Sequence, residues 1–299
     1  MKDGFLYVRN PMNSRQVSKI ILNHETVDGI CFWTKNPASM LPFIEALDNW
    51  PYYIQWTLNG YGPEIEPGLP DKKTALIPRF CRLAQMIGSE RLVWRYDPIF
   101  FSRKYTWDYH LKTFEATAEA LKGHTKRVVI SFLDMYAKMK KQAEVFGMYV
   151  PEREILRPFA HALAQIAEKN GMEIFSCAEE IELSDEGISH GSCIDRNLME
   201  KLIGGPLKGG TDKAQRGLCG CMESIDVGAY DSCPNQCRYC YANAGRERVL
   251  RNFKNYDPAS TVLCSAIVPE DKITVRKMKS LKVHTPDCPG QMLLDLTKG

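Results

Sequence analysis

Three cysteines at positions 233, 237 and 240 have the type and spacing of ligands to a metal cluster. They form the run C-x3-C-x2-C, and an aromatic residue, Tyr239, comes directly before Cys240. Cysteine thiolates at short spacings are the usual ligands of iron–sulfur clusters. The run offers three thiolates and no fourth, so one iron of a four-iron cluster would stay open to another ligand. The pattern therefore predicts a [4Fe-4S] cluster held by Cys233, Cys237 and Cys240.

Two other uses of these cysteines stay open. A zinc ion would need a fourth ligand, for which Cys219, Cys221 or a histidine are candidates. Disulfides fit less well, because no signal peptide opens the chain and nothing else suggests export. Zinc motifs more often use C-x2-C pairs, so the C-x3-C-x2-C spacing favours iron and sulfur. With 11 cysteines and no leader, we expect a protein of the reducing cytoplasm.

Four further cysteines precede the run, in polar and turn-like sequence: Cys177, Cys193, Cys219 and Cys221. Gly220 gives the backbone between the last two the freedom to direct both thiolates at one centre. We therefore expect a second four-thiolate site, holding a second [4Fe-4S] cluster or, as the alternative, structural zinc. Of the four remaining cysteines, those at 31, 81 and 264 are expected to be small buried side chains.

The composition is that of an ordinary globular protein. Of 299 residues, 44% are hydrophobic and 25% are charged, and the net charge is +3. Between Tyr241 and Gly299, ten Lys or Arg stand against six Asp or Glu, so the positive charge concentrates at this end. No stretch approaches the ~20 consecutive apolar residues of a membrane span, so we expect no membrane partner.

Short apolar runs alternate with helical stretches over the first 181 residues. The runs predict strands at 27–33, 53–58, 91–96, 126–132 and 172–176. Helices are expected at 38–49, 71–87, 107–121 and 152–170, with Asp71 and Thr106 as N-caps. This alternation predicts an α/β fold of parallel β/α repeats that form a partial or distorted TIM-like barrel, with an open doubly wound sheet as the alternative. A C-terminal cysteine-rich loop region follows it.

The pattern divides the chain into three parts. Residues 1–181 would form the repeat core, residues 182–260 a cysteine-rich cluster-binding region with a short helix at 195–203, and residues 261–299 a basic, loosely packed tail. Polar residues stand at the ends of the predicted strands, among them Lys35, Arg95 and Asp97. Active sites lie at the carboxyl ends of parallel strands, although turn formation alone would also explain such residues.

Six sequence blocks carry a resemblance to a known family. They are Tyr7–Pro11, Phe32–Pro37, Trp94–Ile99, Cys177–Glu180, His190–Asp195 and the loop of Cys233, Cys237 and Cys240. Over roughly residues 4–260, the chain resembles the prokaryotic domain-of-unknown-function family 1848, which looks like a relative of the radical S-adenosylmethionine (SAM) enzymes. Members of this family usually begin with one more strand, so the resemblance implies a core without its first strand. In radical SAM enzymes the cluster loop normally follows the first strand, whereas here it follows the repeats.

The resemblance implies an enzyme that uses a [4Fe-4S] cluster to cleave SAM and to abstract hydrogen from an unidentified substrate. An external electron donor would then be required. Lys35 and Arg95 would bind a carboxylate or phosphate, Asp97 would bind ribose hydroxyls or orient Arg95, and Tyr239 would contact the cofactor. Each could instead form a structural ion pair or contact.

A binding module without turnover is the alternative function. Its cysteines would hold zinc or an inert cluster, and its basic residues would meet an acidic partner or nucleic acid. Those basic residues are Arg246, Arg248, Arg251 and Lys254.

Overall fold

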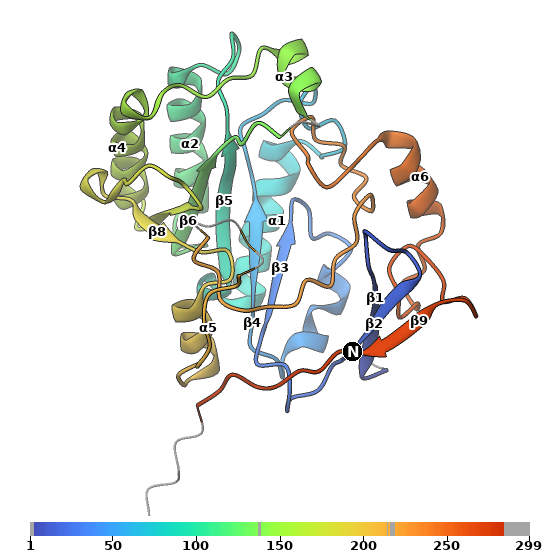
Figure 1. The fold of residues 1–299 in the computed structure, drawn as a ribbon. Coiled ribbons are helices and arrows are strands. Elements are labelled where there is room, and N and C mark those ends of the chain that lie inside the picture. Colours follow the sequence, from blue (N-terminus) through green and yellow to red (C-terminus); the bar gives the residue numbers. More distant parts are fainter. Residues whose placement is uncertain (1–2, 137–138, 214, 216–218, 284–299) are drawn as a thin grey trace, which may run out of the picture.

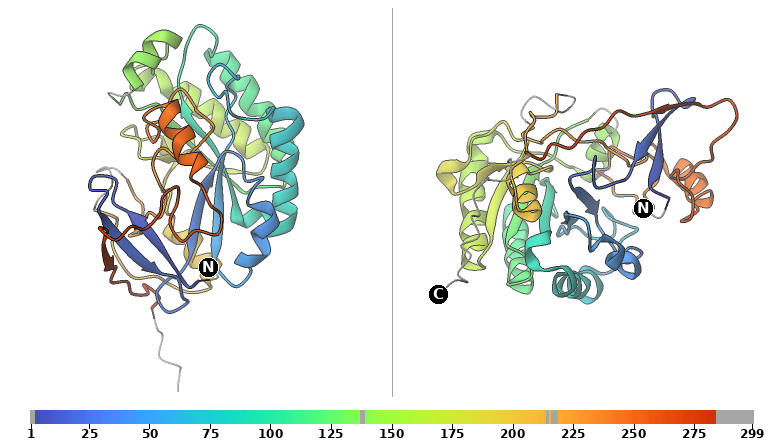
Figure 2. Two further views of the ribbon diagram at one scale, coloured as in Figure 1. Left: turned by 90° about the vertical axis from the view of Figure 1, so that its right-hand side faces the viewer. Right: turned by 90° about the horizontal axis from the view of Figure 1, so that it is seen from below.

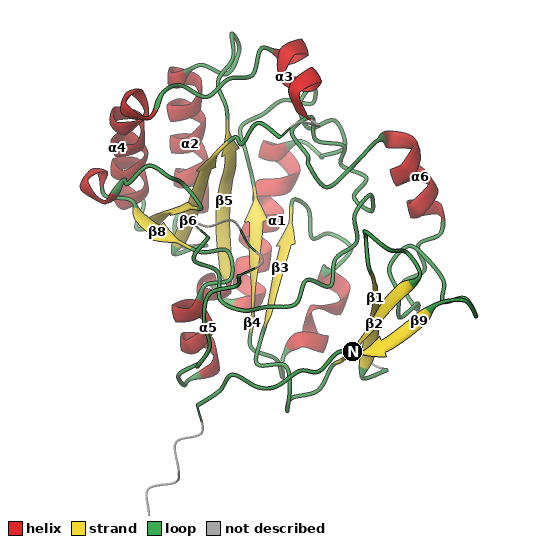
Figure 3. Cartoon of the chain, in the orientation of Figure 1, coloured by secondary structure: helices red, strands yellow, loops and turns green. Residues whose placement is uncertain are grey.

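The computed structural model describes residues 3–136, 139–213, 215 and 219–283, which form a mixed α/β fold with two sheets (Figure 1, Figure 3). The larger sheet has six parallel strands that pair in chain order. Its strands are β3 (Ile30–Thr34), β4 (Tyr52–Thr57), β5 (Leu92–Ile99), β6 (Arg127–Phe132), β7 (Glu173–Cys177) and β8 (Ser189–Gly191).

The five predicted strands are confirmed as β3 to β7. β3 and β4 pair in parallel from Ile30 opposite Tyr52, as expected for a connection long enough to cross over. β8 was not predicted, because its three residues are too few to show a periodic pattern. β3 and β8 are the edges of this sheet, so the described residues form an open parallel sheet and no closed barrel.

The helices that connect the strands cover one face of the sheet (Figure 2). The long helices on this face are α1 (Ile77–Ile87), α2 (Trp107–Leu121) and α4 (Arg153–Lys169). The short helix α3 (Lys140–Phe146) precedes α4, and the short helix α5 (Arg196–Ile203) follows β8 and packs on the opposite face. The helix expected at 38–49 is a 3-10 helix, Leu41–Leu47. The helix expected at 71–87 opens with a π-helical turn, Lys72–Leu76, before α1 begins. Two further 3-10 turns are Ser89–Arg91 and Ser184–Glu186.

Both predicted N-caps are confirmed. The Asp71 carboxylate accepts a hydrogen bond from Thr74 N at 2.7 Å, and the Thr106 hydroxyl accepts one from Tyr109 N at 3.2 Å. Each bond satisfies an amide that the first turn of a helix leaves without a partner.

Alternating side chains give the sheet two different faces. Ile54 and Trp56 of β4 belong to the main core with the helices, whereas Tyr53 packs on the other face with Leu198 and Met199 of α5. The cysteine-rich segments cross this second face, which we call the inner face (Figure 2). Because both faces are covered, the strands can be apolar along their whole length, as the sequence indicated.

A smaller sheet joins the two ends of the described chain. β1 (Phe5–Arg9) pairs antiparallel with β2 (Gln16–Ile21), which pairs in parallel with β9 (Lys272–Val275). Arg9 and Asp271 form a two-point ion pair with N–O distances of 2.6 and 2.8 Å. Residues 272–275 of the predicted tail are thus held in a sheet, and residues 284–299 lie outside the described residues. The helix α6 (Arg246–Lys254) lies beside this sheet (Figure 1).

No helix in the described ranges combines the length and apolar character needed to cross a membrane.

Candidate functional site

Three polar residues meet at the carboxyl ends of neighbouring strands. Lys35 follows β3, Asn59 follows β4, and Asp97 lies near the end of β5. Asn59 Nδ2 donates to the Asp97 carbonyl at 2.9 Å, and Asn59 Oδ1 accepts from the Asp97 amide at 2.8 Å. The edge of the sheet where a parallel α/β fold carries its ligands is therefore a connected polar surface.

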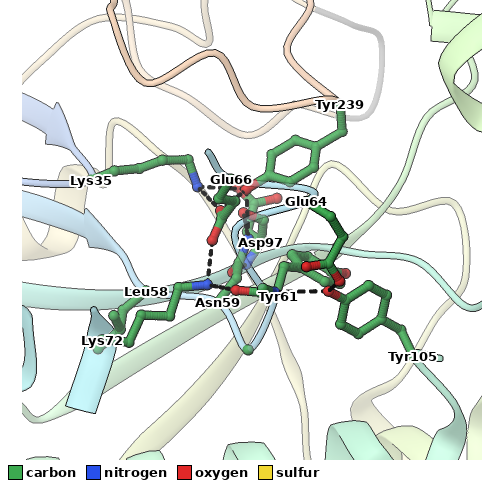
Figure 4. Close-up of polar contacts among 12 residues, drawn as sticks. Lys35, Leu58, Asn59, Tyr61, Glu64, Glu66, Lys72, Asp97, Tyr105 and Tyr239 are labelled. Atoms are coloured by element: carbon green, nitrogen blue, oxygen red, sulfur yellow. Dashed lines mark hydrogen bonds and ion pairs between the residues drawn. The ribbon is translucent and has the colours of Figure 1, made fainter. Parts of the chain in front are cut away.

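Glu66, in the loop after β4, is the buried carboxylate at the centre of this surface (Figure 4). Its side chain is 1% exposed, Lys35 Nζ lies 3.0 Å from Oε1, and Lys72 Nζ pairs with Oε2. Burial opposes ionisation of Glu66, but the two ammonium groups outweigh it and hold the pKa of Glu66 below its usual value. The carboxylate is therefore charged, and both of its oxygens have cationic partners.

The phenol of Tyr239 fastens the cysteine loop to this carboxylate (Figure 4). Its oxygen accepts hydrogen bonds from Lys35 Nζ at 2.7 Å and from Asn59 Nδ2 at 3.1 Å, and its hydroxyl donates to Glu66. Because Tyr239 lies between the second and third cysteines of the C-x3-C-x2-C run, its docking holds that run over the ends of β3 and β4.

Backbone contacts support the same docking. Gly68 N donates to Asn235 O at 3.0 Å, and Arg238 N donates to Ile65 O at 2.9 Å. A Cβ atom at Gly68 would lie 2.6 Å from the Cα of Asn235, so this close approach requires glycine. The loop after β4 and the cysteine loop therefore form one packed unit.

The three cysteines of the run differ in exposure. Cys233 is exposed, whereas Cys237 and Cys240 are half-buried. Burial, partly offset by Lys35, raises the pKa of Cys237 to about 12, and burial raises the pKa of Cys233 as well. Cys240 interacts electrostatically with both of the other thiols. At neutral pH the Cys233 and Cys237 thiols are therefore protonated in this arrangement.

A second group of thiols lies on the inner face of the sheet. The Sγ atoms of Cys177, at the end of β7, and Cys193 are 3.0 Å apart. Hydrogen bonds from the Cys177 and Cys221 thiols hold the pKa of Cys193 well below its usual value. Cys193, burial and, to a smaller extent, Cys219 raise the pKa of Cys221, so Cys219 is a further neighbour of this thiol. The structure thus places together the four cysteines that the sequence assigned to a second site, and we call them the inner thiol group.

Arg95 joins the inner thiol group to the strand edge. Its Nη1 donates to Cys193 Sγ at 3.0 Å, and its Nη2 pairs with Asp97 Oδ2 at 2.7 Å. Burial disfavours the cation, but the neighbouring Asp97 and Cys193 outweigh it and raise the pKa of Arg95 well above its usual value. A hydrogen-bonded path therefore runs from Cys193 through Arg95, Asp97 and Asn59 to Tyr239.

All four residues expected to bind a cofactor, Lys35, Arg95, Asp97 and Tyr239, are members of this network. Three members of the network were not predicted from the sequence: Glu66, Lys72 and Gln55. Gln55 belongs to it because its Oε1 accepts a hydrogen bond from Arg95 at 2.7 Å. Glu66 and Lys72 stand in a loop whose path past the strand ends no local pattern reveals. The polar turn that begins at Asn59 was the one available signal.

Cys31 is a further neighbour of the inner thiol group. It was expected to be a small buried side chain, and its Sγ lies 3.7 Å from the carbonyl oxygen of Cys193 and 3.4 Å from Gln55 Nε2. Burial raises the pKa of Cys31 to about 12, so its thiol is neutral.

Across the part of the chain that the structure describes, no three Cys, His, Asp or Glu side chains are placed to hold one metal ion. The thiols of both groups would have to rotate before they could share a metal or a cluster.

Fold and site together define an α/β protein with an open parallel sheet, whose inner face and C-terminal edge carry two groups of cysteines. The model of the family described as Domain of unknown function (DUF1848) matches residues 1–242, so the chain belongs to this family. No curated protein matches the chain.

Proposed function

We propose that this protein is an iron–sulfur enzyme of the radical SAM type, with Cys233, Cys237 and Cys240 as the ligands of its [4Fe-4S] cluster. The docking of Tyr239 is the observation that carries the proposal. It holds a loop with three thiols over the ends of β3 and β4, where parallel α/β enzymes bind their ligands. In this proposal the open sheet is a partial barrel, and SAM and the substrate bind at its C-terminal edge.

The donor set fits such a cluster in kind and in number, because thiolates are the normal ligands of iron–sulfur clusters. The side chains do not converge on one ion as they stand, so binding requires their rotation on a backbone that Tyr239 already anchors. Since burial raises the pKa values of Cys233 and Cys237, cluster binding also releases protons from these thiols.

A bound cluster would supply the electron that cleaves SAM, and an external donor would then reduce the cluster again. The residues of the chain would hold the cysteine loop in place and set the charge of the site. Glu66 forms ion pairs with Lys35 and Lys72 and accepts a hydrogen bond from the Tyr239 hydroxyl. Asp97 accepts from Arg95 and from the Ser131 hydroxyl, and its side chain stays 20% exposed. That carboxylate can accept a hydrogen bond from a hydroxyl group of a bound ligand.

We assign the inner thiol group, Cys177, Cys193, Cys219 and Cys221, to a second four-thiolate site. It would hold a second [4Fe-4S] cluster or a structural zinc ion, because four protein ligands close the coordination shell. The buried cation of Arg95 supports this assignment, since it offsets the negative charge of the thiolates. A closed site would transfer electrons or stabilise the fold and would not bind substrate.

Anaerobic reconstitution of the full chain with iron and sulfide tests the proposal. We expect a brown protein with a broad visible absorption band that dithionite bleaches, and formation of 5′-deoxyadenosine from SAM. A colourless protein that binds zinc in place of iron would contradict it.

Single cysteine variants identify the ligands. Cys233→Ala, Cys237→Ala and Cys240→Ala should each lose about four irons per chain together with 5′-deoxyadenosine formation, because a three-ligand cluster has no spare thiolate. Cys264→Ala is the matched control and should retain both. Full iron content and activity in any of the three variants would exclude that residue as a ligand.

A further inference from the structure

Three exposed tyrosines from separate segments gather next to the cysteine loop. Tyr136 follows β6, Tyr230 precedes the cysteine run, and Tyr241 follows Cys240; their exposed fractions are 40%, 51% and 57%. The ring centroids of Tyr136 and Tyr241 are 5.7 Å apart, and Tyr241 interacts electrostatically with Tyr230 and Cys240. We call these three residues the tyrosine cluster. Exposed apolar surface concentrated in one place is typical of a binding site.

A basic helix lies next to this cluster. α6 carries four cations and a single acid, Glu247. The cations are Arg246, Arg248, Arg251 and Lys254, and all are exposed. Within the described residues, Arg248 alone among them forms an ion pair, with Asp231 at 3.4 Å. The other three charges therefore face solvent.

Two more aromatic rings stand at the end of this helix. Phe253 and Tyr256 are 49% and 48% exposed, and their rings are stacked with centroids 6.3 Å apart. The surface of α6 therefore combines unpaired cations with exposed rings.

Asp231 fixes the tyrosine cluster and α6 relative to one another. Its amide donates to Ala242 O at 3.0 Å, and its carbonyl accepts from Asn252 Nδ2, on α6, at 3.1 Å. Because Tyr230 is adjacent to Asp231 and Tyr241 is adjacent to Ala242, the first bond holds the two tyrosine segments side by side. The coil that leads into α6 also passes beside the segment before α3, which contains Tyr136 (Figure 1).

We propose that the tyrosine cluster and α6 bind a single strand of nucleic acid. Its bases would stack on the tyrosine rings, and its phosphates would contact Arg246, Arg251 and Lys254. Aromatic rings beside a basic track are the common means of binding single strands, because every base has a face that can stack. A duplex stacks its bases internally, so it would use the cations and not the rings. An acidic protein would likewise not explain three tyrosines gathered at one place.

The bound strand would lie beside Cys240, at the edge of the sheet where we place the chemistry. Binding of the nucleic acid does not depend on the iron–sulfur cluster. The further step, that this nucleic acid is the substrate, rests on the proposed function and adds a substrate class to that function.

Fluorescence anisotropy with the full chain tests the proposal, before and after reconstitution. The probes are a labelled single-stranded DNA of about 12 nucleotides, within the usual range of such sites, the RNA of the same sequence, and the corresponding duplex. We expect a single strand to bind more tightly than the duplex, and the DNA and RNA probes to show which sugar is preferred. Binding without 5′-deoxyadenosine formation would contradict the proposed enzyme and leave the surface intact.

Variants separate stacking from charge. Tyr230→Ala and Tyr241→Ala should each weaken binding at least about fivefold, whereas Tyr241→Phe, which keeps the ring, should bind normally. Tyr149→Ala is the control, because Tyr149 is 54% exposed and lies outside the cluster.

The double variant Arg251→Ala/Lys254→Ala should reduce the slope of log affinity against log salt by about 1.4, the value for two phosphate contacts to a single strand. Lys112→Ala/Lys122→Ala, which removes two exposed lysines at α2, should not change it. No binding, equal binding of the duplex, or full binding by both alanine variants of the tyrosines would overturn the proposal.

Discussion

The hydroxyl of Tyr239 accepts a hydrogen bond from Lys35 Nζ at 2.7 Å, although the two residues are 204 positions apart in the sequence. This contact ties the cysteine loop to the strand at the edge of the parallel sheet. The placement of the cysteine run therefore depends on a phenol and an ammonium group that share the buried carboxylate of Glu66.

Tyr239→Phe removes the hydroxyl and leaves its buried partners with fewer hydrogen bonds. We expect the free energy of unfolding to fall by about 1–3 kcal/mol, measured by urea denaturation. Iron bound after reconstitution should fall too, because the loop loses its anchor. Tyr109→Phe is the control, since among the described residues that hydroxyl has a single hydrogen-bond partner, the Gly60 carbonyl at 2.6 Å. If Tyr239→Phe matches the native chain in stability and iron content, the hydroxyl does not anchor the loop.

Glu66→Gln removes the negative charge between Lys35 and Lys72. We expect a loss of about 3 kcal/mol in the free energy of unfolding, because two ammonium groups lose a buried counter-ion. Glu64→Gln on the same loop is the control. Glu64 is 37% exposed and its partner Lys104 is 61% exposed, so its charge should contribute less than about 1 kcal/mol. Equal losses in the two variants would show that burial of Glu66 has no special role.

Cys177→Ala should abolish metal binding at the inner thiol group and leave the cluster at the cysteine loop in place. Because Cys177 Sγ is 3.0 Å from Cys193 Sγ, its removal takes one of four expected ligands. We expect a loss of about four irons, or one zinc, per chain, with the site at Cys233 retained. Metal analysis and the visible spectrum measure both, and Cys81→Ala is the control. Unchanged metal content in Cys177→Ala would show that the inner thiol group holds no metal.

The buried side chain of His110 should make the fold sensitive to acid. Its Nε2 donates to the Phe100 carbonyl at 2.9 Å, and its Nδ1 lies 2.8 Å from the Tyr96 hydroxyl, which donates to it when the ring is neutral. Burial lowers the pKa of His110 to about 4. Below pH ~6.5 His110 binds a proton in the unfolded chain but stays neutral in the folded chain. The free energy of unfolding therefore falls as the pH drops from about 6.5 to about 4.

We therefore expect His110 to account for a loss of about 2 kcal/mol in the free energy of unfolding between pH 7.5 and pH 5. Urea denaturation at the two pH values measures it. His110→Gln has no titrating ring and should lack this part of the pH dependence, whereas His161→Gln, on the exposed face of α4, should keep it. An identical pH dependence in His110→Gln and the native chain would contradict the buried neutral ring.

Strands β3 to β7, the helices α1, α2, α4 and α5 and the N-caps at Asp71 and Thr106 followed from local pattern. Hydrophobic periodicity and helix capping depend on neighbours a few positions away, so both can be recognised in the sequence alone. The family resemblance was also visible in short blocks. Strands β1, β2, β8 and β9 and the helices α3 and α6 were missed, because they are short or are stabilised by partners far along the chain.

The sequence by itself determined the parallel α/β repeat, the ends of its strands and two sets of cysteines with the chemistry of metal ligands. Only the tertiary structure decided that Glu66 meets Tyr239, 173 positions away, and that Arg95 reaches the sulfur of Cys193. The physical reason is that these contacts depend on the paths of two long loops across the sheet. Those paths result from the packing of the whole chain, and no local run of residues encodes them.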